Sequence, residues 1–178
     1  MTQQIDLERP TSGDVVELIL ADHHTFEELL RELRDATADR DSARKTFATL
    51  HVAHAEAEEL NVYPELRKQS AIGEHEEDHS EEEHAEGHEA LLAVLESPET
   101  GGDRFDDLVE KLAEKVNHHL TEEELTILNP AREDVDEDLR FRLGAAFAEE
   151  RNRLIDEGCG DIENVRAIVQ EARDEGLI

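Results

Sequence analysis

Hydrophobic residues recur at intervals of three and four along most of this chain, and this spacing predicts helices. The first apolar stripe follows Asp14 and Glu17, a pair typical of a helix N-terminus, and runs to about Ala36. The stripe contains Val16, Ile19, His23, Phe26, Leu30 and Leu33. Residues 1–13, which end in a polar turn, are interpreted as an extended arm.

Three further helical patterns follow the first. One runs from about Ser42 towards Tyr63, and Pro64 either ends this helix or kinks it. The next begins inside an acidic, histidine-rich stretch and ends near Leu95. The last begins after a glycine-containing break, and its pattern fades near Pro130. The four patterns predict an all-α fold, an up-down four-helix bundle over residues 14–130.

The two halves of this predicted bundle have similar motifs. Each half begins with a helix that carries an acid–His dipeptide, at Asp22 in the first half and Glu83 in the second. Each then has a helix with a His, a Glu-Glu-Leu sequence and a proline. We therefore expect two αα-hairpins of similar design that face each other.

The remaining residues, 131–178, are interpreted as a C-terminal helical extension. Apolar residues at helical spacing predict one helix over about Asp136–Asp156. A short final helix is expected from about Ile162, after a Gly-Cys-Gly turn. We expect this extension to pack on the bundle.

Composition and charge narrow the function. The 178 residues suffice for one domain with a buried core. The formal net charge of −30 argues against nucleic acid and anionic membranes as partners, because both attract basic rather than acidic surfaces. The acidity is interpreted as a solvated surface that favours solubility.

Three features predict a cytoplasmic location. Cys159 is the only cysteine, so it forms no internal disulfide and a reducing compartment fits. The first ten residues have neither the basic nor the apolar region of a secretory signal. No stretch approaches the roughly 18 apolar residues that a membrane span needs.

Helical phase, at about 100° per residue, separates the ten histidines. Those predicted to face the core are His23, His54, His84, His88 and His119. Those predicted to face solvent are His24, His75, His79 and His118. His51 precedes His54 by three residues, so phase alone admits it to the core as well.

A single buried histidine is usually a hydrogen-bonded core residue rather than a metal ligand. Here, however, four predicted helices each place an imidazole on the buried stripe, and two of them add a carboxylate about one turn later. Unsatisfied buried polar groups cost roughly 1–3 kcal/mol each, and metal ions satisfy all of them at once. The pattern therefore predicts a dinuclear metal site, whose imidazole and carboxylate ligands suit Fe, Zn, Cu or Ni.

The spacing does not decide whether Glu123 or Glu124 is the last carboxylate ligand of this site. Glu123 follows His119 by four residues and lies on the same face of a regular helix. Glu124 follows by five residues, about 140° away, and needs a locally loosened helix to reach the same place.

The order H, H-x-x-x-E, H-x-x-x-H, H-x-x-x-x-E over residues 14–130 resembles the hemerythrin family, including the bacterial HHE cation-binding proteins. The resemblance implies two Fe ions, joined by an oxo or hydroxo bridge and by the carboxylates of Glu58 and Glu124. It selects His54 over His51 and Glu124 over Glu123. The implied ligands are His23, His54, Glu58, His84, His88, His119 and Glu124. His23 and His54 are assigned to an iron with an open position, and the other three histidines to a closed one.

The resemblance also implies the function of a soluble, non-haem di-iron protein that binds or senses O2, peroxide or NO, with a role in oxidative stress. One alternative is an enzyme that removes peroxide or NO, with catalase- or peroxidase-like turnover and His51 or Tyr63 as proton donor. Tyr63 is otherwise interpreted as a packing residue at a helix end. Further alternatives are a metal-storage protein that uses His75 and His79, and a helical scaffold without metal. The sequence indicates no redox partner.

Overall fold

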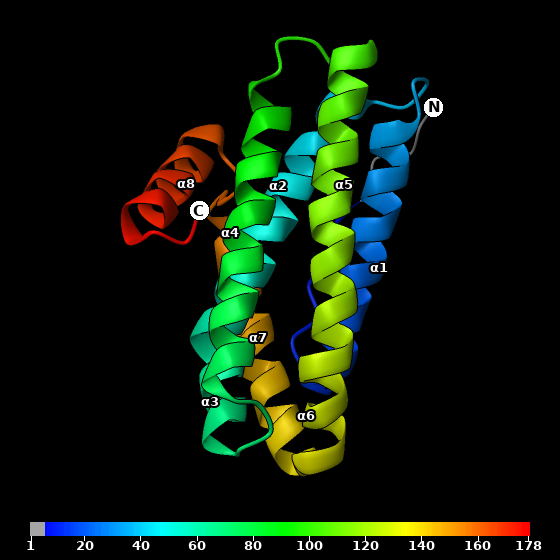
Figure 1. Cartoon of the computed structure of the whole chain (residues 1–178). Helices are drawn as coiled ribbons and strands as arrows, with labels where there is room; N and C mark the ends of the chain where they lie inside the picture. Colours follow the sequence, from blue (N-terminus) through cyan, green and yellow to red (C-terminus); the bar gives the residue numbers. More distant parts are fainter. Residues whose placement is uncertain (1–5) are drawn as a thin grey trace.

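The computed structural model describes residues 6–178, and every regular element in this range is a helix (Figure 1). The predicted all-α class is therefore confirmed. Residues 1–5 of the predicted N-terminal arm lie outside the described range, and residues 6–13 have no regular structure. Within the described range, no helix has the length and apolar character needed to cross a bilayer. The elements are α1 (Val15–Arg34), α2 (Arg40–Ala57), η1 (Glu58–Val62), α3 (Tyr63–Lys68), α4 (Glu74–Glu96), α5 (Asp103–Glu123), η2 (Glu124–Leu128), α6 (Asn129–Asp134), α7 (Glu137–Asp156) and α8 (Ile162–Glu175).

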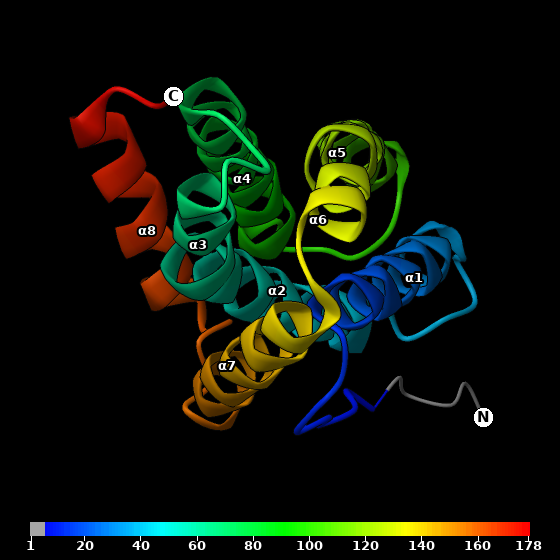
Figure 2. The same cartoon turned by 90° about the horizontal axis from the view of Figure 1, so that it is seen from below.

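Helices α1, α2, α4 and α5 are the long helices of the predicted bundle and lie side by side (Figures 1 and 2). Helix α1 begins as predicted, since the Asp14 carboxylate accepts a hydrogen bond from the backbone N–H of Val16. Helix α4 begins at Glu74, so it includes the whole acidic, histidine-rich stretch.

The interior of the bundle contains two hydrophobic clusters with a polar layer between them. On α1, Ile19 belongs to one cluster and Phe26 to the other, and His23 lies between them. On α2, Leu50 and Ala57 flank His54 in the same way. The apolar spacing thus packs both ends of the bundle and leaves the predicted histidine ligands and Glu58 in one buried layer.

Two of the long helices widen into a π-helical turn just after their last α-helical residue. η1 links α2 to α3, and η2 links α5 to α6. Each is followed two residues later by a proline, Pro64 or Pro130. Proline has no N–H to donate, and its ring collides with the carbonyl four residues earlier. A wider turn relieves that collision, so Pro64 does not end its helix, and the fourth predicted helix continues past Pro130 to Asp134.

The C-terminal extension packs on the bundle. Helix α7 lies against α1 and α2, and α8 lies against α4 (Figure 2). Two glycines permit this close approach. A Cβ at Gly144 on α7 would collide with the backbone carbonyl of Gly13, and one at Gly160 would collide with the backbone of Thr49 on α2.

Candidate metal centre

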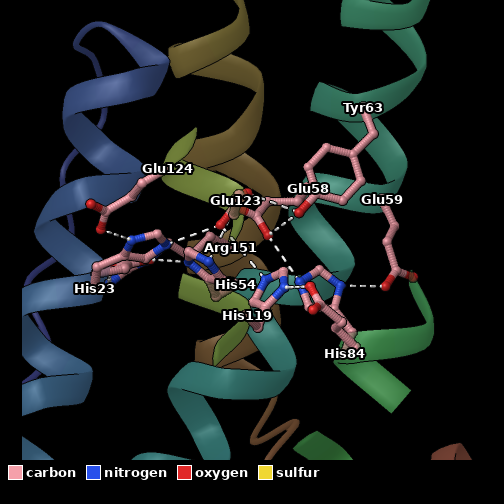
Figure 3. Close-up of polar contacts among 12 residues, drawn as sticks. His23, His54, Glu58, Glu59, Tyr63, His84, His119, Glu123, Glu124 and Arg151 are labelled. Atoms are coloured by element: carbon pink, nitrogen blue, oxygen red, sulfur yellow. Dashed lines mark hydrogen bonds and ion pairs between the residues drawn. The ribbon is translucent and has the colours of Figure 1, made fainter. Parts of the chain in front are cut away.

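The polar layer contains two groups of buried metal-binding side chains (Figure 3). Within each group, one donor atom from each residue lies within 4.8 Å of the others. The first group is His23, His54 and Glu123, and the second is Glu58, His84 and His119. All six residues are at most 4% exposed. They come from α1, α2, η1, α4 and α5, so all four long helices of the bundle meet at this layer.

The two carboxylates lie between histidines of both groups. Glu58 Oε1 is 3.1 Å from His54 Nε2, and Glu58 Oε2 is 3.3 Å from His84 Nε2. Glu123 Oε2 is 3.0 Å from His23 Nε2 and 3.6 Å from His119 Nε2. Each carboxylate therefore lies between the two groups, where it could contribute a ligand to a metal ion on either side.

The Nδ1 atom of each of these four histidines contacts a carboxylate on the far side of the ring. The Nδ1–oxygen distances are 2.9 Å for His23 to Glu124, 3.0 Å for His54 to Asp22, 2.7 Å for His84 to Glu59, and 2.9 Å for His119 to Glu83. A carboxylate accepts hydrogen bonds, so Nδ1–H donates and the Nε2 lone pair is left for the centre. Metal-binding histidines are commonly held in this way.

The C-terminal extension reaches the centre through one of these supporting carboxylates. Arg151 on α7, which is 3% exposed, donates from Nε and Nη2 to the two oxygens of Asp22, over 2.8 and 2.7 Å. Burial raises the pKa of Asp22, but His54 and Arg151 outweigh it and hold the pKa below its usual value. Asp22 is therefore charged and can orient the His54 ring.

Several donor atoms that face the centre make no well-formed hydrogen bond, although His54 Nε2 and Glu58 Oε1 lie 3.1 Å apart. The buried atoms in this state are Nε2 of His54, His84, His88 and His119 and Oε1 of Glu58. Buried polar atoms are rarely left unpaired, because each costs roughly 1–3 kcal/mol. Imidazole nitrogen and carboxylate oxygen are ligands that Fe and Zn accept. The residues present therefore fit a pair of transition-metal ions.

Charge at the centre also favours cations. Burial lowers the pKa of His54 and of His84, but the Glu58 carboxylate, aided by Asp22 at His54 and Glu59 at His84, raises both to about 10. The carboxylates thus hold protons on these imidazoles when no metal is bound. Metal ions displace those protons, because only the neutral imidazole has a free lone pair.

The placement of the last carboxylate favours Glu123 over the Glu124 selected from the resemblance. Helix α5 remains α-helical through Glu123, so the four-residue spacing from His119 holds and the helix loosens only afterwards. Glu123 is 1% exposed, whereas the side chain of Glu124 is 47% exposed and contacts the outer nitrogen of His23. In this arrangement Glu124 contacts a histidine from its outer side, and its role as a metal ligand stays a prediction.

His88 and His51 are both buried beside the centre, outside its two groups. Their rings meet edge to face with centroids 4.6 Å apart. Burial lowers the pKa of His88 to about 3 and that of His51 well below its usual value, so both are neutral at pH 7. The absence of a side chain at Gly87 makes room for His51, since a Cβ there would lie 2.9 Å from Nε2. His88, one turn after His84, remains a predicted ligand.

Tyr63 lies at the centre although regular helical phase placed it about 140° from Glu58. Its hydroxyl is 3.0 Å from Glu58 Oε2 and 2.8 Å from Glu123 Oε1. The π-helical turn explains the difference, because the Tyr63 N–H bonds to the Glu58 carbonyl five residues earlier and the two side chains then share a face. The nearby Pro64 was the sequence signal for this irregularity.

The spacing pattern gave no role to the acids of the two acid–His dipeptides, Asp22 and Glu83, and the structure shows one. Asp22 on α1 supports His54 on α2, and Glu83 on α4 supports His119 on α5. The repeated motif therefore encodes the same contact twice, once in each hairpin. Figure 3 shows the related contact of Glu59 with His84.

Residues 6–178 have only helices as regular elements and gather buried histidines and carboxylates in two adjacent groups, which defines a class of helical proteins able to bind metal ions in their core. Comparison with protein families is more specific: the model of the hemerythrin HHE cation binding domain matches residues 14–130. The chain belongs to this family. Searches among curated proteins and among solved structures found no match.

Proposed function

We propose that the protein is a non-haem di-iron protein that binds or senses a small oxidant ligand, namely O2, peroxide or NO. The observation that supports it best is the position of Glu58 and Glu123, each between histidines of both groups. The family match and the alternating directions of the long helices in Figure 1 support the family's up-down bundle as the scaffold.

In the proposed centre, the two metal positions have different numbers of histidine ligands, and this difference creates the site where a small ligand binds. His23 and His54 lie on one side, whereas His84 and His119, with His88 one turn away, lie on the other. The side with two histidines leaves a coordination position for a small ligand, and iron there supplies the redox chemistry that such ligands require.

The surroundings of that side suit a small, weakly polar ligand. The rings of Phe26 and Phe147 meet the His54 ring edge to face, with centroids 5.2 and 5.8 Å away. Both phenylalanines are 1% exposed, so they exclude bulk water from the His54 side of the centre.

Metal analysis and optical spectroscopy of the full chain, expressed with iron, test this proposal. We expect about two irons per chain, as in dinuclear sites, and absorption bands that change when O2, peroxide or NO is added. Glu123→Ala should lose iron. Glu124→Ala should keep it with affinity reduced about 10–100-fold, the usual effect of removing a residue that supports a ligand. Glu122→Ala is the matched control. A colourless, iron-free protein contradicts the proposal, and iron loss in Glu124→Ala alone contradicts the role of Glu123.

Tyr63 favours a second candidate function, turnover of peroxide at the same centre. Burial and the carboxylates of Glu58 and Glu123 raise the Tyr63 pKa well above its usual value, so the phenol stays protonated and can donate a hydrogen bond to a bound peroxide. Oxygen evolution from peroxide should then fall in Tyr63→Phe at unchanged iron content. Activity no greater than that of free iron rejects this candidate.

A further inference from the structure

A second cluster of metal-binding groups lies on the outer side of Glu83, at the surface between α4 and α5. It consists of His79 and Glu83, one turn apart on α4, and His118 on α5. Their donor atoms lie within 4.8 Å of one another. None of the three belongs to the buried groups, although Glu83 also contacts His119.

The spacing of the donor atoms fits one metal ion. Glu83 Oε1 is 3.1 Å from His118 Nε2 and 3.4 Å from His79 Nε2. A tetrahedral ion with bonds of about 2.0–2.1 Å holds its ligand atoms about 3.3 Å apart. Both imidazoles therefore present their Nε2 atoms to the same carboxylate oxygen at nearly the separation that a shared ion requires.

Glu83 distinguishes this cluster from an ordinary surface ion pair. Its side chain is 6% exposed, and Oε1 is buried without a hydrogen-bond partner. The other oxygen, Oε2, accepts the hydrogen bond from His119 Nδ1. A buried carboxylate oxygen that makes no hydrogen bond is costly, and contacts with two exposed histidines offset little of that cost, because exposed ion pairs contribute little stability. A bound cation removes the cost at Oε1.

We propose that His79, Glu83 and His118 bind a divalent transition-metal ion such as Zn²⁺ or Fe²⁺, with water in the remaining positions. Two imidazoles and a carboxylate form a donor set that suits these ions. The net charge of −30 raises the local concentration of cations at the surface. His79 and His118 are 45% and 60% exposed, so an ion reaches them directly from solvent.

Glu83 connects this surface ion to the buried centre, with Oε1 on the ion and Oε2 on the His119 ring. The surface site goes beyond the proposed di-iron function, and its formation requires only the three residues named. The surface site lies one carboxylate away from His119, a histidine of the buried centre.

Titration of the iron-loaded full chain with Co²⁺ tests the surface site, because tetrahedral Co²⁺ has strong visible absorption and His ligands show shifted proton NMR signals. We expect about one additional Co²⁺ per chain with shifted signals from His79 and His118. Affinity should fall at least about tenfold in His118→Ala and in His79→Ala. The control His24→Ala removes an exposed histidine from α1 and should bind like the wild type.

Equal Co²⁺ binding by the wild type and by the double variant His79→Ala/His118→Ala overturns the surface site, as does a wild type that binds no additional Co²⁺. Failure of the di-iron proposal is distinguishable from both results. If the chain loads no iron, Co²⁺ also enters the buried groups, but the difference between the wild type and the double variant still reports the surface site alone.

Discussion

Charge balance explains how the buried layer persists in a protein interior. Glu58 and Glu123 are at most 1% exposed, and isolated carboxylates so deeply buried take up protons to become neutral. Here His54 and His84 face Glu58 and carry the compensating positive charge, with their pKa raised to about 10. His54 and His84 therefore release these protons when a cation binds. Because protons and the cation compete for the imidazoles, metal affinity falls as pH falls.

His88 differs from His54 and His84, because its pKa is lowered in the folded protein instead of raised. Its folded-state pKa of about 3 lies below the ordinary 6.5, so between these values the unfolded chain binds the additional proton. This residue should therefore lower the unfolding free energy of the metal-free protein as pH falls from about 6.5 towards 3, by up to about 1.4 kcal/mol per pH unit. Urea unfolding at several pH values gives the unfolding free energy at each pH. Between pH 6.5 and 3 this free energy should fall less steeply in His88→Gln than in the wild type. Exposed His24→Gln is the control, and an unchanged slope in His88→Gln contradicts the prediction.

Helical phase could predict which histidines are buried, because each residue's direction follows from regular geometry. His23 and His119 are buried, and their neighbours His24 and His118 are exposed, as predicted. Helical phase gave the wrong direction for the Tyr63 side chain, because Tyr63 follows a π-helical turn. A spacing pattern does not show where such a turn begins, so the placement of Glu123 and Glu124 also required the structure.

At the scale of elements, the apolar spacing predicted the four long helices but not their continuation past the prolines. A proline in a helical pattern is compatible with an end, a kink or a widened turn, and packing decides among them. Here Val62 and Leu66 on one side, and Ile127 and Ala131 on the other, are buried in the same cluster. Burial of these side chains keeps both helices continuous beyond the widened turns.

Helix α7 lies outside the family-matched residues 14–130 and yet supports the centre through Arg151. Arg151→Met leaves the buried Asp22 charge with His54 alone and should cost roughly 3–5 kcal/mol of unfolding free energy, as expected when one partner of a buried ion pair is removed. It should also weaken metal binding about 10–100-fold. Arg153→Met, which breaks a solvent-exposed pair on the same helix, should cost much less, because exposed ion pairs contribute little stability.

Chemical denaturation and metal titration of both variants measure these effects. Adding Asp22→Asn to Arg151→Met removes the buried charge that Arg151 balanced and should recover part of the lost stability, which separates a charge effect from a packing defect. Equal losses in Arg151→Met and Arg153→Met contradict a supporting role for Arg151.

At the scale of the whole molecule, the two hairpins contribute matching parts to one centre. His23, Asp22 and His54 in the first correspond to His84, Glu83 and His119 in the second. The support also crosses between hairpins, because Glu124 contacts His23 and Glu59 contacts His84. The sequence showed the repeated motifs, but only the folded chain shows which acid meets which histidine, since those partners lie between 25 and 101 residues apart.

The net charge of −30 opposes the compact state of the whole chain, because the acidic side chains repel one another more strongly when the protein is folded. Salt screens this repulsion, as the Debye length falls from about 10 Å at 0.1 M to about 3 Å at 1 M. We expect the urea midpoint of the metal-free protein to rise between these KCl concentrations, with a gain on the order of 1 kcal/mol, a sum of surface interactions worth a few tenths each. A variant with Asp107→Lys and Glu114→Lys, two exposed acids of α5, should show a smaller gain. If KCl lowers the midpoint, or the variant gains as much as the wild type, surface repulsion is not what limits the stability of this fold.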